Sequence, residues 1–102
     1  MMNIEKHITR VDIPKSIGNL NLLKKLYLFD NCIKSLPDSI GYLKSLEILD
    51  LKKNNIKSLP DSITKLKSLK KLLIKSNKLA PLSENLTKWL KDLEQNGCKI
   101  FK

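Results

Sequence analysis

The sequence predicts a single α/β solenoid: a short right-handed horseshoe with a parallel sheet on its concave face and short helical turns on its convex face. The main support is a repeat, because segment 43–64 recurs with substitutions at 20–41 and at 66–87, offset by 23 residues on each side. Each copy holds a leucine–x–leucine or leucine–x–isoleucine alternation, which is the period of a strand with one buried face. A fixed period of this length is typical of stacked repeat proteins.

Length and composition agree with one domain. The chain has 102 residues, of which 41% are hydrophobic, an ordinary share for a globular protein. No apolar run approaches the length of a membrane span, and the charged segment 1–10 lacks the apolar stretch of a signal peptide. We therefore expect a cytoplasmic protein, or one delivered into another cell if it acts as an effector.

The net charge of the chain is +10, from 20 lysines and arginines against 10 acidic residues. Almost all of the basic residues are lysines, which favour a diffuse positive field over bidentate contacts with phosphate. The simplest explanation is a solubilising surface. An acidic protein partner and nucleic acid are the alternatives.

Residues 1–12 are expected to form an N-terminal cap, in which isoleucines and a valine lay down a first, degenerate strand. The repeat phase begins at residue 13, because 13–18 matches 36–41 at the same 23-residue offset. A cap is needed since an exposed terminal layer would present leucines to water.

Three full repeats follow, each with the pattern L-x-x-L-x-L-x-x-N-x-L and isoleucine at some leucine positions. The pattern begins at Leu23, Leu46 and Leu69. After the first two copies, Leu-Pro ends the strand path, because proline cannot donate to a sheet. The Asp-Ser pairs at 38–39 and 61–62 are good N-cap residues for a helical turn that returns an isoleucine to the core.

Over residues 13–86 the chain resembles a leucine-rich repeat protein, with the motif completed by a distal L-P-x-x-I. The 23-residue length is similar to the intracellular repeats of Ras-associated and of bacterial or protist leucine-rich proteins. The resemblance implies that Asn31, Asn54 and Asn77 form a ladder that bonds the backbone of adjacent turns. A buried amide suits this role because it offers donors and acceptors to loop groups without a strand partner.

The third repeat departs from the pattern after Leu79, and a C-terminal cap is expected from Pro81 onward. Apolar residues at helical spacing predict an amphipathic helix, with Ser83 as its cap and Gly97 as its stop; they are Leu86, Trp89, Leu90 and Leu93. We assign the repeats to 13–86 and the cap helix and strand to 87–102, with 99–101 as the last strand. Trp89 is interpreted as core beneath the cap, with a binding hot spot as the alternative.

The residues offer no chemistry typical of a catalytic or metal site. His7 is the single histidine, and there is no Cys-x-x-Cys pair or phosphate-binding glycine loop. Cys32 and Cys98 lie about three strand spacings, roughly 14 Å, apart, so we expect free thiols in a reducing compartment. Glu47 and Asp50 are interpreted as solvated ion pairs with lysines. We predict no enzyme, no cofactor and no metal.

The candidate site is the concave face, where stacking aligns the outward residues of the strands into columns. The predicted columns are Lys25, Ile48 and Lys71; Tyr27, Asp50 and Leu73; and Phe29, Lys52 and Lys75. Four of these residues are apolar where water is expected, and lysines surround them. An apolar centre with a charged rim is typical of a partner site, although scattered surface apolar residues are also common.

These columns predict a monomeric, non-catalytic module that binds an acidic or amphipathic protein segment on its sheet. Nucleic-acid binding is the first alternative, but interleaved aromatics, arginines and any known motif are lacking. Homotypic assembly as a scaffold is the second, because the ends of a short solenoid present open strand edges.

Overall fold

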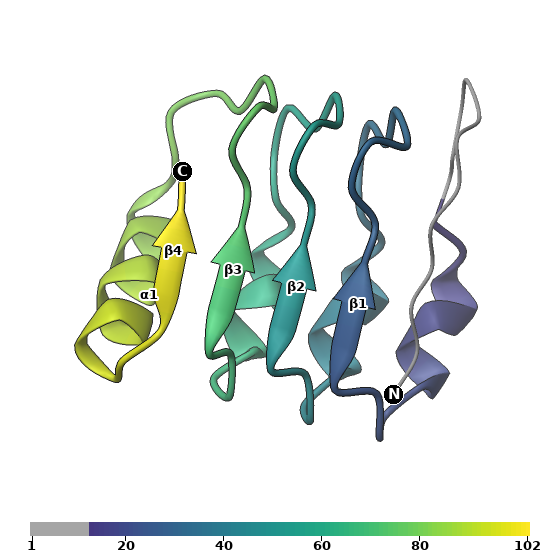
Figure 1. Cartoon of the computed structure of the whole chain (residues 1–102), viewed down its shortest axis with the longest axis horizontal. Helices are drawn as coiled ribbons and strands as arrows, with labels where there is room; N and C mark the ends of the chain where they lie inside the picture. Colours follow the sequence, from purple (N-terminus) through teal and green to yellow (C-terminus); the bar gives the residue numbers. More distant parts are fainter. Residues whose placement is uncertain (1–12) are drawn as a thin grey trace.

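Four strands from successive turns of the chain lie side by side in one parallel sheet, and the helical segments lie behind it (Figure 1). The computed structural model describes residues 13–102, so the predicted N-terminal cap and His7 lie outside the described residues. The strands are β1 (Lys25–Tyr27), β2 (Ile48–Asp50), β3 (Lys71–Leu73) and β4 (Lys99–Phe101), in that order across the sheet. Helical turns η1 (Lys15–Asn19), η2 (Asp38–Tyr42), η3 (Asp61–Lys65) and helix α1 (Glu84–Gln95) alternate with them.

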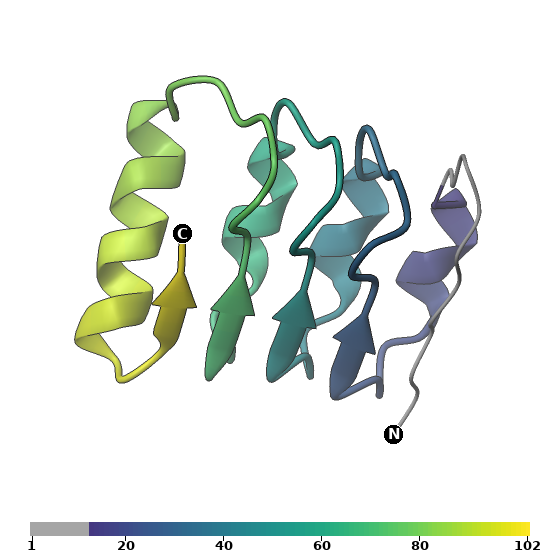
Figure 2. The same cartoon turned by 45° about the horizontal axis from the view of Figure 1, so that its top comes forward.

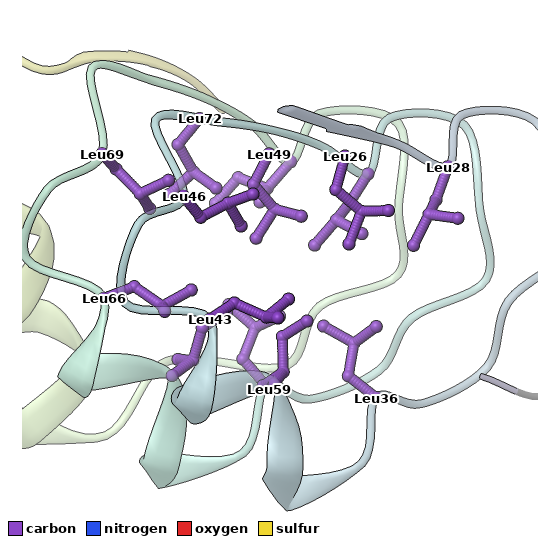
Figure 3. Close-up of a cluster of buried hydrophobic side chains, with 14 of the residues drawn as sticks. Leu26, Leu28, Leu36, Leu43, Leu46, Leu49, Leu59, Leu66, Leu69 and Leu72 are labelled. Carbon is purple, nitrogen blue, oxygen red and sulfur yellow. The ribbon is translucent and has the colours of Figure 1, made fainter. Parts of the chain in front are cut away.

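The 23-residue period sets the strand register. The inward leucines Leu26, Leu49 and Leu72 lie directly opposite one another across β1, β2 and β3, and each is 0% exposed. Figure 3 shows the leucines of the strand side facing those that return from the helical side. The core is therefore a stack of aliphatic layers. Each turn of the chain contributes one layer, with leucines from its strand side and from its helical side. This architecture confirms the predicted α/β solenoid.

The convex turns are 3-10 helices, and their start differs from the prediction. Pro37 and Pro60 occupy the N-cap positions without a side-chain cap, so Asp38 and Asp61 begin the helices. The prediction of Asp-Ser capping was therefore wrong, because the fixed φ of proline already sets the extended entry that a capping residue would adopt. The adjacent helices pack closely: a Cβ on Gly41 would lie 2.4 Å from the Ser62 carbonyl oxygen.

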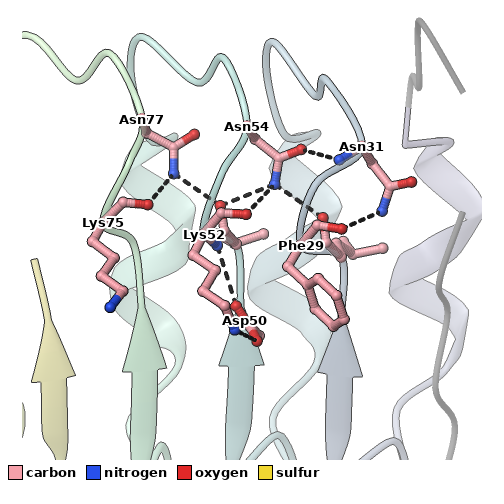
Figure 4. Close-up of polar contacts among 9 residues, drawn as sticks. Phe29, Asn31, Asp50, Lys52, Asn54, Lys75 and Asn77 are labelled. Carbon is pink, nitrogen blue, oxygen red and sulfur yellow. Dashed lines mark hydrogen bonds and ion pairs between the residues drawn. The ribbon is translucent and has the colours of Figure 1, made fainter. Parts of the chain in front are cut away.

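Asparagine side chains join successive turns where the chain leaves each strand (Figure 4). The Oδ1 of Asn54 accepts from the N–H groups of Asn31 at 2.9 Å and Ile33 at 3.0 Å. Its Nδ2 donates to the carbonyls of Leu28 and Leu51, both at 2.9 Å. Asn77 repeats the arrangement one turn later, accepting from the N–H of Ile56 and donating to the carbonyl of Leu51. Each of these two amides thus satisfies backbone groups in its own turn and in the turn before it.

In the C-terminal cap, helix α1 packs against the last 3-10 helix, η3, and against β4. Helix α1 buries Leu86, Trp89, Leu90 and Leu93, and the Ser83 side chain accepts from the N–H of Leu86 at 3.2 Å, as expected. The indole Nε1 of Trp89 donates to the Leu66 carbonyl at 3.0 Å, so this residue belongs to the core. Because α1 begins at Glu84, the assignment of the cap helix from residue 87 placed its start three residues late. Strand β4 pairs with β3, as proposed for 99–101.

Candidate functional site

The strands place the predicted concave-face residues in adjacent columns. Register pairing aligns Lys25, Ile48 and Lys71 in one column and Tyr27, Asp50 and Leu73 in the next. The third column lies beyond the strand ends and is held by two backbone hydrogen bonds. They run from the Asp30 N–H to the Lys52 carbonyl at 3.1 Å and from the Lys53 N–H to the Lys75 carbonyl at 3.2 Å. Phe29, Lys52 and Lys75 therefore follow the same stacking as the strands.

Strand β4 extends two of these columns with residues that were not predicted from the sequence to belong to the site. Lys99 lies opposite Lys71, and Phe101 lies opposite Leu73 with 39% of its surface exposed. The Nζ of Lys71 is 5.9 Å from the centroid of the Phe101 ring. The 28-residue offset from β3 to β4 hides these residues from a 23-residue alignment. The sequence signal that could have found them was the short apolar strand after Gly97.

The apolar members of the columns are partly covered. Tyr27, Phe29, Ile48 and Leu73 are each half-buried. Lys71, Lys75 and Lys99 are exposed, and Lys25 is half-buried. The face therefore combines partly exposed apolar side chains with exposed lysine side chains.

Asp50 lies at the centre of this face and is buried, with only 3% of its surface exposed. Its carboxylate accepts from the Nζ of Lys52 at 2.8 Å and from the backbone N–H of Lys52 at 3.2 Å (Figure 4). The same Nζ is 4.7 Å from the centroid of the Phe29 ring. The pair therefore differs from the predicted solvated one: the Asp50 carboxylate is buried, Tyr27 and Leu73 flank Asp50 in its column, and its partner Lys52 is half-buried.

This ion pair changes which charges are available to a partner. Lys52 and Asp50 neutralise each other within the face. Lys25, Lys71, Lys75 and Lys99 have no acidic partner within 4.0 Å among residues 13–102. The available charge on the concave face is thus positive.

Glu47 lies outside this arrangement and is not paired with Asp50. Its carboxylate is 3.9 Å from the Nζ of Lys24 and 3.8 Å from the Nζ of Lys70, so it links three successive turns through weak, half-exposed contacts. The two acids therefore have separate lysine partners, as expected, and do not form an acid–base pair.

The two cysteines are free thiols in different parts of the fold. Burial, with a smaller contribution from Glu94, raises the pKa of the Cys98 thiol above its ordinary value, which disfavours the reactive thiolate. No group of three or more histidine, cysteine or acidic residues within 13–102 is arranged to hold a metal ion. Across the same residues, no helix has the length and apolar character needed to cross a membrane.

The parallel sheet, the 23-residue turns and the asparagine bonds between them define a leucine-rich repeat solenoid. The family described as "leucine-rich repeat region" matches residues 3–99, and the chain belongs to this family. The family and fold are typically non-enzymatic and suggest a protein-interaction module.

Comparison with known proteins supports the same assignment. A solved structure of a leucine-rich repeat protein from Leptospira interrogans is similar, with 36% sequence identity and a TM-score of 0.74. The alignment covers 88% of this chain and 22% of that one, so the chain spans about a fifth of the length of that protein. No curated protein matches the chain.

Proposed function

We propose that the concave sheet binds an acidic or amphipathic segment of a partner protein. The observation that carries the proposal is the gathering, on one face, of half-buried apolar side chains with lysines that have no acidic partner. These apolar residues are the half-buried Tyr27, Phe29, Ile48 and Leu73, and the exposed Phe101 of β4 adds to them. Aromatic residues are favoured anchors at interfaces, and an apolar centre with a charged rim is the usual anatomy of one.

The lysines would act mainly on the rate of encounter. Lys71 and Lys75 are exposed and lie next to the apolar residues, so they attract an acidic segment before contact is made. Asp50 contributes by holding Lys52 over the Phe29 ring, and it is too buried to contact a partner extensively.

The first test is capture of partners from nuclease-treated extract at physiological salt, followed by mass spectrometry. It compares the wild type with Tyr27→Ala/Phe29→Ala/Leu73→Ala. The matched control is Leu22→Ala/Tyr42→Ala, which removes two exposed apolar residues outside the columns. We expect a protein that the wild type and the control retain and the triple variant loses. Equal recovery by all three contradicts the proposal, and capture seen only in a parallel extract without nuclease would support nucleic-acid binding instead.

The second test separates steering from contact once a partner is known. Lys71→Glu/Lys75→Glu should slow association by at least about tenfold at low salt and flatten its salt dependence. Lys44→Glu/Lys67→Glu makes the same change in net charge at exposed lysines away from the columns. Equal effects of the two double variants would show that only the overall charge matters.

A further inference from the structure

Two helical segments behind the sheet lie side by side with a groove between them. Helix α1 contacts η3 and is the longer of the two, with 12 residues against 5 (Figure 2). A cavity of about 540 Å³ lies between them, and we call it the η3–α1 groove. Thr64 and Lys67 form one wall, and residues of α1 form the other. The groove therefore lies inside the stack of helical segments, away from the concave columns.

A residue change at one repeat position keeps these two helices apart. A Cβ on Gly18 would lie 2.8 Å from the Ser39 carbonyl oxygen, and one on Gly41 would lie 2.4 Å from the Ser62 carbonyl oxygen. The two glycines therefore let η1, η2 and η3 pack closely. The equivalent residue of η3, 23 positions after Gly41, is Thr64. Because Thr64 carries a side chain, α1 cannot approach η3 as closely as the 3-10 helices approach one another.

The η3–α1 groove has an apolar floor and polar walls. Trp89 and Leu93 line it and are both buried, so they form its floor. The exposed side chains of Asn85, Gln95 and Asn96 line it from α1. None of these three amide groups has a hydrogen-bond partner within residues 13–102. A concave surface with an apolar floor and a few polar groups is the usual anatomy of a binding site.

The chain itself shows what such amides bind. The side chain of Asn54 accepts from the N–H groups of Asn31 and Ile33 and donates to the Leu28 carbonyl. One amide thus holds a neighbouring backbone segment through both its donor and its acceptor. The amides of the η3–α1 groove offer the same groups to the backbone of a ligand.

The length of the groove sets the size of that ligand. Asn85 and the C-cap residue Asn96 lie at opposite ends of the α1 wall. At 1.5 Å per residue, they are about 16 Å apart along the helix axis. An extended peptide rises about 3.3 Å per residue, so about five residues would span this distance.

Lys67 gives the groove its available charge. It is exposed and has no acidic partner within 4.0 Å in the part of the chain that the structure describes. Lys88 also lines the groove, but its Nζ is 3.2 Å from the Asp92 carboxylate, so these two charges offset each other. An acidic residue of the ligand would therefore find a complementary charge at Lys67.

The floor favours a peptide over a ligand that binds by ring stacking, such as a nucleobase or a sugar. Trp89 is 5% exposed, and its Nε1 already donates to the Leu66 carbonyl at 3.0 Å. It therefore offers no open ring face, which stacking requires.

We propose that the η3–α1 groove binds a short extended peptide segment of a partner protein, about five residues long, with an acidic side chain placed at Lys67. The amides of α1 bond the peptide backbone, and the ammonium of Lys67 selects the acid. This site is separate from the concave columns and does not depend on the function proposed for them.

The test begins with a phage-displayed library of random seven-residue peptides, selected against the immobilised full chain at physiological salt. An enriched peptide is then synthesised and titrated into the ¹⁵N-labelled chain, and the amide signals are followed by NMR. We expect the enriched sequences to share an aspartate or glutamate. We also expect the signals of Thr64, Lys67 and the Trp89 indole N–H to shift. No enrichment would overturn the proposal, and so would shifts confined to β1–β4, although the latter would support the concave site.

Two pairs of variants locate the binding. Asn85→Tyr fills the groove from an exposed position and should weaken binding at least about tenfold. Thr87→Tyr adds the same side chain at an exposed position of α1 outside the groove and should leave the affinity unchanged. Lys67→Glu should weaken binding about fivefold, whereas Lys44→Glu, at the equivalent exposed lysine one turn earlier, should have little effect. Equal effects within either pair would overturn the proposal.

Two further results would assign the groove to another occupant. Shifts of Thr64 and the Trp89 indole that grow with the concentration of the chain, without peptide, would assign it to a second copy. Binding of the chain to a glycan array that Asn85→Tyr abolishes would assign it to a carbohydrate. Either result overturns the peptide ligand.

Discussion

The middle turn, residues 43–65, and the third turn, from residue 66 to the start of α1, carry the same motif in different surroundings. Strand β2 of the middle turn has a repeat strand on both sides, whereas β3 of the third turn has β2 on one side and the cap strand β4 on the other. Asn54 is 6% exposed and Asn77 is half-buried, although their spacing within the motif is identical. The motif therefore specifies the path of the chain, while the neighbours decide what each residue contributes to stability.

The largest difference is expected between Asn54→Ala and Asn77→Ala. Removing the Asn54 amide leaves two N–H groups and the Leu28 carbonyl without these hydrogen bonds in a buried region, while the Leu51 carbonyl keeps its bond from Asn77. At about 1.5 kcal/mol for each of the three groups, the free energy of unfolding should fall by about 4.5 kcal/mol. Asn77→Ala affects fewer and more exposed groups and should cost about 2 kcal/mol. Urea unfolding followed by circular dichroism measures both; equal losses would contradict the comparison.

A smaller difference is expected between Gly41→Ala and Thr64→Ala, at equivalent positions of η2 and η3. A Cβ at Gly41 clashes with the Ser62 carbonyl, so the two helices must separate, which should cost about 3 kcal/mol. Thr64 faces α1 instead of another 3-10 helix and already carries a side chain, whose hydroxyl donates to the Asp61 carbonyl at 2.7 Å. Losing that bond should cost about 1 kcal/mol. A tolerated Gly41→Ala in urea unfolding would show that the helical turns are not closely constrained.

The smallest difference is expected between Lys52→Ala and Lys75→Ala, which occupy one column. Lys52→Ala leaves the buried Asp50 carboxylate without its ammonium partner and should lower the free energy of unfolding by about 2 kcal/mol. Lys75 is exposed and has no acidic partner among the described residues, so its replacement should change stability by less than about 0.5 kcal/mol. Thermal unfolding of the two variants side by side is sufficient. If Lys52→Ala leaves the stability unchanged, the ion pair between Lys52 and Asp50 does not stabilise the fold.

The period explains why most of the fold could be predicted from the sequence. Three phased copies fix the strand register, the inward leucines and the positions of the asparagines, because a one-residue shift would turn every leucine toward water. Asp50 shows the limit of this argument. Its place in the motif is outward, and only the contacts of Lys52 and its neighbours bury it. Phe101 shows another limit. The helix before β4 is longer than the helical turns of the repeats, so β4 does not follow the 23-residue period.

The candidate site was predicted as a set of columns, and the strand register aligns those columns. The lysine charges that are available to a partner could not be predicted from the sequence, because they depend on the side-chain pairing of Lys52 with Asp50.

The position of the indole beneath the cap makes one further observation accessible. Trp89 is the only tryptophan in the chain, and its ring is buried against the third turn with its Nε1 on the Leu66 carbonyl. Its fluorescence emission therefore reports on the docking of α1 alone, whereas the amide signal of the strands reports on the solenoid as a whole. If helix α1 detaches before the repeats unfold, the emission will move to longer wavelength at a lower denaturant concentration than the amide transition. The chain thus carries a natural optical label for the opening of its own end.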